Sequence, residues 1–299
     1  MDMKQFAEKV QITLTALLKE DVQITTQLKL NGICLTGLII KNAESNISPT
    51  IYLNTYYDRY LKTGDLSAVV TSIVKEYQDY KLTTTFDMEW FRDFNQVKDK
   101  ICYRLINYDL NRELLDSVPH IKYLDLAKTY YVPCKLNDTS SGSITIYNSH
   151  LDMWGTTAEE LDILAENNTP RLHAPSFKRI GDCLCELAGT GELPDDESTD
   201  VPQILSHMYV LTNSQNSNGA AAICYQAPLR DFSLKTGKDI IILPSSIHET
   251  ILLPLENTDN INSLKEMVKS VNETQVDPTE RLSDSVYIYR KGTGQIEIA

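Results

Sequence analysis

Long apolar runs are missing from this chain of 299 residues. No stretch approaches the roughly twenty consecutive apolar residues that a membrane-spanning helix needs. The opening residues, MDMKQFAEKV, also lack the basic stretch and the apolar core of a signal peptide. We therefore expect a cytoplasmic protein with no membrane partner.

Basic residues are scarce relative to acidic ones. The 28 Lys and Arg residues stand against 41 Asp and Glu residues, which gives a net charge of −13 at pH 7. Such a charge repels phosphate-rich partners at long range. The acidic residues are spread along the chain, apart from a cluster at 192–200 that is typical of a solvated loop. The composition therefore argues against a nucleic-acid partner.

The spacings that hold metals and nucleotides are also absent. Six cysteines occur without a C-x-x-C pair, and none of the five histidines repeats at i, i+4. Cys183 and Cys185 stand two apart on an expected helix, so their side chains point in different directions. Neither G-x-x-x-x-G-K-[ST] nor G-x-G-x-x-G is present. We expect reduced cysteines, no metal and no cofactor.

What is present is enough apolar sequence for a sizeable core, since 42% of the residues are hydrophobic. Phe6, Val10 and Leu14 recur at helical spacing near the start. Alternating runs on both sides of Asn31-Gly32 predict a β-hairpin, because both residues tolerate the positive φ of a type I′ turn. The next predicted elements are a strand over 48–54 and a helix that begins after Asp65 and extends to Tyr80.

The middle of the chain favours a sheet followed by helices. The aromatic side chains of segment 86–94 are expected to pack over the junction between two halves of the protein. The alternative is that they stack on a ligand. Thr157 and Glu160 form a capping box, and Ser176 is the expected cap of a second helix. The predicted strands are 101–108, 123–132 and 143–147, and the helix capped by Ser176 is expected to extend to 187.

The last third begins after Gly189–Pro202, whose glycines, prolines and carboxylates predict a mobile linker or surface loop. Pro228 and Gly237 bound an expected short helix. The other predicted elements are strands at 208–212, 220–225, 239–243 and 250–255, a helix at 261–271, and a closing hairpin of 286–290 with 295–298.

These patterns together predict an α+β fold, with mostly antiparallel sheets and helices packed on one face. We expect an N-terminal layer over 1–85, a central sheet with helices over 86–190, an acidic linker over 191–202 and a C-terminal lobe over 203–299. One continuous domain is the alternative.

Several stretches resemble a known family. They are NISPTIYLN at 46–54, VKDKICYRLINYDLNRELLDSVPH at 97–120, YLDLAKTYYV at 123–132, NSHLDMWG at 148–155, NNTPRL at 167–172 and ILPSSIHETILLP at 242–254. In order and spacing they resemble the bacterial family catalogued as domain of unknown function 5688, which occurs mainly in Clostridia. The LDLAKTY segment and the C-terminal pattern are more distantly similar to domain of unknown function 1444. Neither resemblance implies an activity.

The segment PSSIHET brings together residue types used in hydrolysis: Ser246, His248 and Glu249. These are the candidate catalytic residues. Catalytic Ser, His and Asp residues normally come from separate parts of a chain, however, and no G-x-S-x-G elbow is present. The alternative is a tight turn in which Ser245 and Ser246 satisfy backbone groups.

Candidate binding residues are Asn148, His150 and Asp152, together with Lys128. His-x-Asp can supply two metal ligands where others converge on it. The structural alternative is that Asn148 or Ser149 caps a helical turn that Trp154 anchors in the core. Asp125 and Lys128 lie in the predicted strand 123–132 and should project to opposite faces of the sheet, and a buried Lys128 needs a carboxylate or carbonyl partner.

Two functions remain open. The sequence favours a non-enzymatic binding or protein-interaction module with a protein partner, because tyrosine is abundant (16 residues) and catalytic motifs are lacking. The alternative is a hydrolase-like enzyme that uses His248 or His150 with nearby Ser and carboxylate residues in an inter-lobe cleft. Convergence of these residues on one pocket would favour the enzyme. The sequence does not indicate an oligomeric state.

Overall fold

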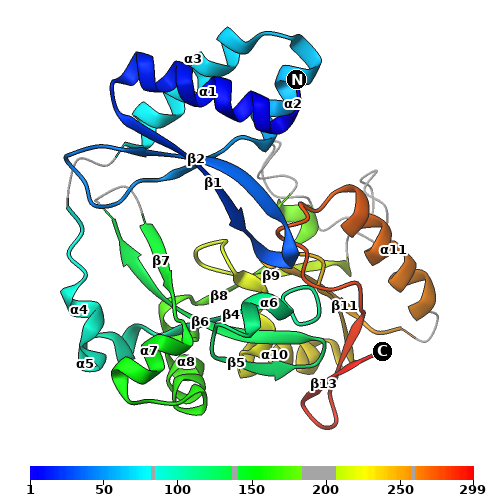
Figure 1. Ribbon diagram of the computed structural model, residues 1–299. Coiled ribbons are helices and arrows are strands. Elements are labelled where there is room, and N and C mark those ends of the chain that lie inside the picture. The colour runs from blue at the N-terminus through cyan, green and yellow to red at the C-terminus, as the bar shows by residue number, and fades with distance from the viewer. Residues whose placement is uncertain (82–84, 137–140, 184–206, 257–259) are drawn as a thin grey trace. The chain divides into compact units, whose positions relative to one another are not determined.

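The computed structural model describes residues 1–81, 85–136, 141–183, 207–256 and 260–299. The chain forms two compact units, Met1–Trp90 and Phe91–Ala299. Both combine helices with antiparallel sheets, so the protein is α+β, as the sequence predicts (Figure 1). The expected linker Gly189–Pro202 lies outside the described residues.

The first unit is a three-stranded antiparallel sheet in the order β1-β2-β3, with helices packed on it. Its elements are α1 (Met3–Leu18), β1 (Asp21–Leu28), η1 (Leu30–Gly32), β2 (Cys34–Lys41), β3 (Thr50–Tyr52), α2 (Asn54–Thr63) and α3 (Leu66–Tyr80).

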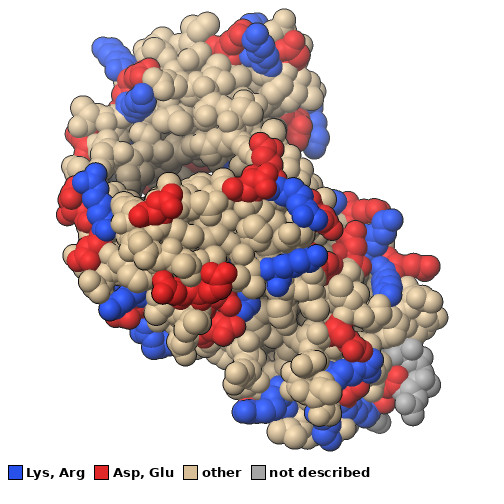
Figure 2. Space-filling view, turned by 60° about the horizontal axis from the view of Figure 1, so that its bottom comes forward, with Lys and Arg blue, Asp and Glu red and all other residues tan. Residues whose placement is uncertain are grey.

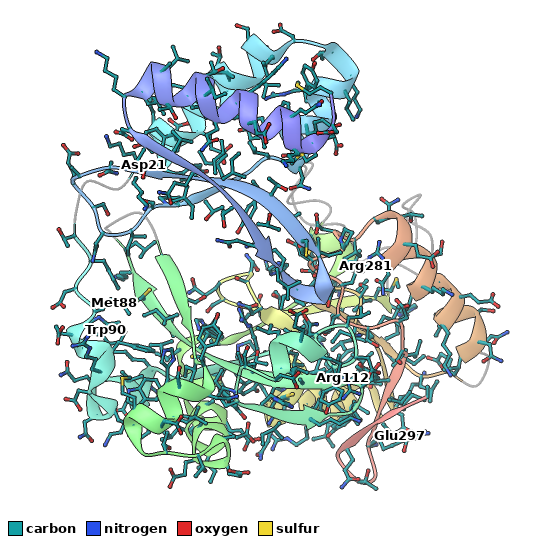
Figure 3. The ribbon with its side chains drawn as sticks, in the orientation of Figure 1. Asp21, Met88, Trp90, Arg112, Arg281 and Glu297 are labelled. Atoms are coloured by element: carbon teal, nitrogen blue, oxygen red, sulfur yellow. The ribbon has the colours of Figure 1, made fainter. Side chains whose placement is uncertain are left out.

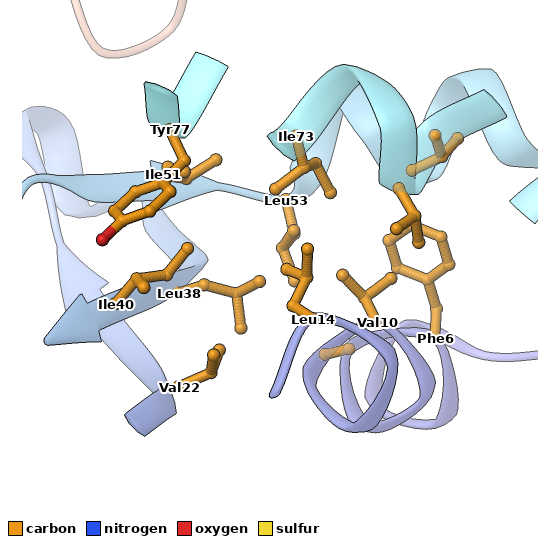
Figure 4. Close-up of a cluster of buried hydrophobic side chains, with 13 residues drawn as sticks. Phe6, Val10, Leu14, Val22, Leu38, Ile40, Ile51, Leu53, Ile73 and Tyr77 are labelled. Carbon is orange, nitrogen blue, oxygen red and sulfur yellow. The ribbon is translucent and has the colours of Figure 1, made fainter. Parts of the chain in front are cut away.

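The core of this unit forms between α1, α3 and the sheet (Figure 4). Phe6, Val10 and Leu14 lie on one face of α1, because a spacing of four residues returns to the same side of a helix. All three are fully buried, and they belong to one cluster with Leu38 and Ile40 of β2. The periodicity in the sequence therefore identifies the buried face correctly.

The strand expected over 48–54 is shorter in the structure. Only β3 is extended, and Asn54 already begins α2, a helix that the sequence analysis did not predict. Leu53 is fully buried, and Gly64 ends α2 with a φ of 69°. The helix expected after Asp65 is confirmed, and the Asp65 side chain accepts a hydrogen bond from the Ala68 amide at 2.9 Å.

The hairpin expected around Asn31-Gly32 is confirmed. Strands β1 and β2 pair antiparallel from Asp21↔Lys41 to Leu28↔Cys34. Asn31 and Gly32 have φ values of 61° and 70°. The connection covers 29–33 and is thus longer than a two-residue turn, but both residues adopt the predicted left-handed conformation.

Replacing Asn31-Gly32 with Val-Val should lower the free energy of unfolding by about 1–3 kcal/mol, because β-branched residues resist positive φ. Urea denaturation of the full chain measures the change. Ala-Ala at the same positions is the control for side-chain branching and should cost less. Equal stability of the Val-Val variant and the wild type would contradict the prediction.

The second unit contains two antiparallel sheets. In the four-stranded sheet, β6 pairs with β4 on one edge and with β5 and β7 on the other; the second sheet has the order β13-β12-β10-β11-β9-β8. The strands are β4 (Cys102–Asn107), β5 (His120–Tyr123), β6 (Leu126–Lys135), β7 (Ser141–Thr145), β8 (Pro175–Arg179), β9 (Tyr209–Asn213), β10 (Ile240–Leu243), β11 (Thr250–Pro254), β12 (Tyr287–Arg290) and β13 (Gln295–Ile298).

Helices flank these sheets. Thr157 and Glu160 form the predicted capping box at the start of α8, and Gly237 ends α10 with a φ of 76°. The helical segments are α4 (Glu89–Arg92), α5 (Phe94–Val97), η2 (Lys98–Lys100), α6 (Arg112–Leu115), α7 (Asn148–Trp154), α8 (Ala158–Leu172), η4 (Gly219–Cys224), α10 (Gln226–Thr236) and α11 (Ile261–Thr274).

The single strand predicted over 123–132 is wrong. A tight turn at Leu124 and Asp125 separates β5 from β6, and Leu124 has a φ of 56°. Asp125 consequently lies in the turn rather than in a strand opposite Lys128. Its backbone carbonyl accepts a hydrogen bond from the Tyr108 amide at 3.0 Å. The apolar pattern continues through the turn, which is why periodicity alone did not locate it.

Two further predictions are corrected by long-range contacts. Pro175–Arg179 forms strand β8 and not the start of a helix, because it pairs with β9 and places Phe177 at 5.0 Å from the ring of Tyr209 and 4.9 Å from that of Phe232. The segment 220–225, predicted as a strand, is mostly the 3-10 helix η4. Its Ala220 amide donates to the carbonyl of Ile247 instead of to a neighbouring strand.

Candidate functional site

A pocket of about 540 Å³ lies in the second unit. Residues from β5, β6, α8, η4, α10 and the β12–β13 hairpin line it. Its polar and aromatic lining comprises Tyr123, Lys128, Glu166, Cys224, Tyr225, Gln226, Arg230, Tyr289 and Gln295. The volume is in the range of pockets that bind small organic molecules.

Lys128 is the buried cation of this pocket. Its side chain is only 7% exposed, and its ammonium lies 2.8 Å from Glu166 and 3.4 Å from Asp162. Burial lowers the pKa of Lys128, but the hydrogen bond to Glu166 and the nearby carboxylates outweigh burial and raise it. Lys128 is therefore charged at neutral pH and is held by two carboxylates.

The pairing follows from local geometry. Asp162 and Glu166 stand four residues apart on α8, so they face the same side of that helix. The hydroxyl of Tyr130 donates to Asp162 at 3.0 Å, and the ammonium of Lys128 lies 5.2 Å from the centre of the Tyr103 ring. These contacts hold Lys128 in one position.

Cys224, whose thiol could in principle act as a nucleophile, also lines this pocket. Burial raises the pKa of its thiol to about 12, although Lys128 and a hydrogen bond with Tyr123 act in the opposite direction. A thiol with such a pKa is protonated at neutral pH, and the thiolate is the reactive form. Cys224 therefore contributes a surface for binding and not an activated nucleophile.

The candidate catalytic residues lie in the turn between β10 and β11. The Ser246 hydroxyl accepts a hydrogen bond from the backbone amide of His248 at 3.0 Å. His248 Nδ1 accepts one from the amide of Asn218 at 3.3 Å, and its Nε2 lies 3.4 Å from Glu280. Both ring nitrogens are thus engaged, and neither contacts the serine hydroxyl as a general base would.

This turn is tied to its surroundings by backbone contacts. Ser246 forms an isolated β-bridge with Arg281, a residue labelled in Figure 3. Desolvation raises the pKa of Glu249, and a hydrogen bond with Ser246 and the charge of His248 oppose that shift. The observed contacts agree with the structural alternative, in which Ser246 satisfies a backbone group of a tight turn.

The candidate binding residues Asn148, His150 and Asp152 lie on α7. The His150 ring packs 5.0 Å from Phe91, and its Nδ1 accepts from the Tyr147 amide at 3.1 Å. Burial lowers its pKa. Asp152 is exposed. It points in a different direction from His150, because the two residues are two positions apart on a helix. The pair does not chelate one ion.

The residue that caps α7 differs from the expected Asn148 or Ser149. Tyr147 precedes the helix as its cap residue, whereas the amide group of Asn148 donates to the carbonyl of Asp116 at 3.1 Å. Trp154 is half-buried, contacts the rings of Phe91 and Phe94, and donates to the carbonyl of Phe91 at 3.0 Å. It anchors this helix as expected.

The sequence-derived candidates therefore occupy three separate places. Of them, only Lys128 lines the pocket, and the described contacts of His150 and His248 have no residue in common. The tyrosines of the pocket and the acceptors on α8 were missed. The signal that could have indicated the ion pair is Asp162 and Glu166 four residues apart on one helix, together with Lys128 inside the apolar part of a strand.

Within the described ranges, no three His, Cys, Asp or Glu side chains form a group that could hold a metal ion. We expect a strong chelator to leave the thermal midpoint within about a degree or two, because loss of a structural metal would lower it far more. Differential scanning calorimetry with and without the chelator measures this. Stoichiometric zinc or iron together with a large chelator-induced drop would contradict it.

In the part of the chain that the structure describes, no helix is both long and apolar enough to cross a membrane. A family model described as a family of unknown function (DUF5688) matches residues 3–291. The chain belongs to that family. No curated protein and no solved structure matches the chain significantly.

Proposed function

We propose that this member of the DUF5688 family is a non-enzymatic binding module, and that the pocket around Lys128 is its binding site. The supporting observation is the lining, in which Tyr123, Tyr225 and Tyr289 surround the ion pair of Lys128 and Glu166. Tyrosines supply apolar area and a hydrogen-bonding hydroxyl at little cost in side-chain entropy.

The chemistry of the pocket indicates the kind of ligand. Glu166 keeps 59% of its side chain exposed while it holds Lys128, so its carboxylate can still accept hydrogen bonds from a ligand. Leu229 and Ile296 add apolar surface. The ligand we propose has an aromatic or aliphatic part and at least one hydrogen-bond donor. It is a small organic molecule or a side chain of that size inserted by a protein partner.

The hydrolase alternative is the weaker proposal. It requires a hydrogen bond from the serine hydroxyl to the histidine, but Ser246 and His248 meet through the backbone amide of His248. In the pocket itself, the raised pKa of Cys224 opposes nucleophilic catalysis. Charge also opposes nucleic-acid binding, since acidic and basic side chains are interspersed on the face seen in Figure 2. A bacterial, cytoplasmic setting is part of our proposal.

The test blocks the pocket with a larger side chain at its edge. Gln226 and Ala227 are both exposed on α10, but only Gln226 lines the pocket. Gln226→Trp should weaken ligand binding by about tenfold or more, which equals about 1.4 kcal/mol, whereas the matched control Ala227→Trp should bind as the wild type does.

Each protein is incubated with a small-molecule extract and, separately, a protein extract of the source cells, and native mass spectrometry identifies what is retained. A ligand recovered unchanged supports a binding module, and conversion to a product supports an enzyme. Equal retention by Gln226→Trp and the wild type would place binding elsewhere.

A further inference from the structure

The four-stranded sheet of the second unit has a second face, opposite to Lys128. Neighbouring residues in a strand point to opposite faces, and directly paired residues share a face. Thr129 of β6 pairs with Arg104 of β4 and with His120 of β5. Thr129 and Arg104 therefore lie beside His120 on the face that Lys128 does not occupy.

The same face continues along β6. Tyr131 pairs with Thr145 of β7, two positions beyond Thr129. The Arg104 guanidinium reaches both threonines, with Nε at 3.4 Å from the Thr129 hydroxyl and Nη2 at 3.3 Å from the Thr145 hydroxyl. It lies 6.0 Å from the centre of the Tyr131 ring. Arg104 is thus held in place by hydroxyl groups and an aromatic ring.

Arg104 lacks the carboxylate partner that Arg112, Arg230 and Arg290 of this unit have. Arg112 contacts Asp109 at 2.7 Å, Arg230 contacts Asp231 at 3.0 Å, and Arg290 contacts both Asp239 and Glu297. Among the described residues, no carboxylate lies within 4.0 Å of Arg104. The side chain is nevertheless half-buried, and desolvation lowers its pKa.

A desolvated guanidinium without a counter-ion is unfavourable, because hydroxyl groups replace only part of its lost hydration. Its two contacts with threonines are long, and a guanidinium has five N–H donors, so donors remain for an acceptor. Each threonine that accepts from Arg104 keeps a hydroxyl hydrogen to donate. Thr129 is only 1% exposed and serves to hold Arg104, so the donors available to a ligand are the guanidinium and the half-buried Thr145 hydroxyl.

His120 and Lys122 of β5 lie on the same face. The Nδ1 of His120 lies 3.1 Å from the carbonyl of Val118, which accepts its hydrogen and leaves Nε2 as the second ring nitrogen. Lys122 pairs with Ala127, so it shares the face with Arg104, and it is exposed. Two cations, Arg104 and Lys122, thus share this face in a chain with a net charge of −13.

We propose that this face, defined by Arg104, His120, Thr129 and Thr145, binds an oxyanion group of a small molecule. A planar guanidinium matches the two oxygens of a carboxylate or the oxygens of a phosphate, and the Thr145 hydroxyl provides a further donor. The net charge of the chain disfavours a polyanion such as nucleic acid. This site is independent of the Lys128 pocket, since the two lie on opposite faces of the sheet.

The experiment measures binding of two probes to the full chain by isothermal titration calorimetry at fixed ionic strength. The probes are inorganic phosphate and citrate. The wild type should bind at least one of them saturably, and the stronger probe identifies the oxyanion as phosphate or carboxylate. Arg104→Lys should weaken binding about tenfold or more, because lysine cannot form the two parallel hydrogen bonds. Thr145→Val should weaken it by a smaller factor.

Arg112→Lys, at an exposed arginine that has its own carboxylate, is the matched control and should bind as the wild type does. The thermal midpoint of Arg104→Met without ligand is the second readout. It should equal or exceed that of the wild type, since this variant removes an uncompensated charge.

Failure of the folded wild type to bind either probe would overturn the proposal. Unchanged binding by both Arg104→Lys and Thr145→Val would also overturn it, and so would a large drop in the midpoint of Arg104→Met, which would assign a structural role to Arg104.

Discussion

Gly219→Ala should reduce the free energy of unfolding by about 3 kcal/mol or more, the upper range for overpacking a core. A Cβ atom at position 219 would lie 2.1 Å from the hydroxyl of Thr212, 2.4 Å from the carbonyl of His248 and 2.8 Å from the amide of Asn213. Two of these atoms belong to the backbone, which cannot move aside as a side-chain end can.

Gly292→Ala is the matched control. No atom lies within 4 Å of its Cβ position, so the same chemical change should leave stability within about 0.5 kcal/mol of the wild type. Guanidinium denaturation of the full chain, followed by far-ultraviolet circular dichroism, measures both variants. Equal midpoints for the two variants would show that the turn beside Gly219 relaxes, and would contradict the prediction.

Asp125→Ala should cost about 3 kcal/mol, because it removes the acceptor of three hydroxyl groups. The Asp125 carboxylate accepts hydrogen bonds from Ser283 at 2.6 Å, from Ser285 at 2.9 Å and from Tyr287 at 2.5 Å. These bonds join the β5–β6 turn to the segment that leads into β12. Burial, and after it the charge of Asp125, raises the pKa of Tyr287, so its hydroxyl remains a donor at neutral pH.

Two variants test the mechanism. Asp125→Asn keeps one carbonyl oxygen and should cost less, about 1–2 kcal/mol. Asp109→Ala removes a carboxylate from an exposed ion pair with Arg112 and should cost under about 1 kcal/mol. Urea denaturation measures all three variants. If Asp125→Ala unfolds at the same urea concentration as Asp109→Ala, the three hydrogen bonds do not stabilise the fold.

The sequence by itself determined the elements whose signals are local. The face of α1 follows from the spacing of Phe6, Val10 and Leu14, and the β1–β2 hairpin follows from Asn31-Gly32. Caps and breakers act within one turn of the chain, so they can be recognised without knowledge of the fold. The α+β class followed from these elements, and the family followed from ordered motifs along the chain.

Tertiary structure alone decided the elements and sites that depend on distant partners. Phe177 lies in a strand because β9 pairs beside it and Tyr209 stacks on its ring. Lys128 contacts Asp162 and Glu166, which lie 34 and 38 residues further along the chain on α8. The sequence pattern of the strand that carries Lys128 does not indicate where that helix packs. Burial makes such contacts strong, and burial is a property of the folded chain, so a single sequence does not reveal which polar residues meet.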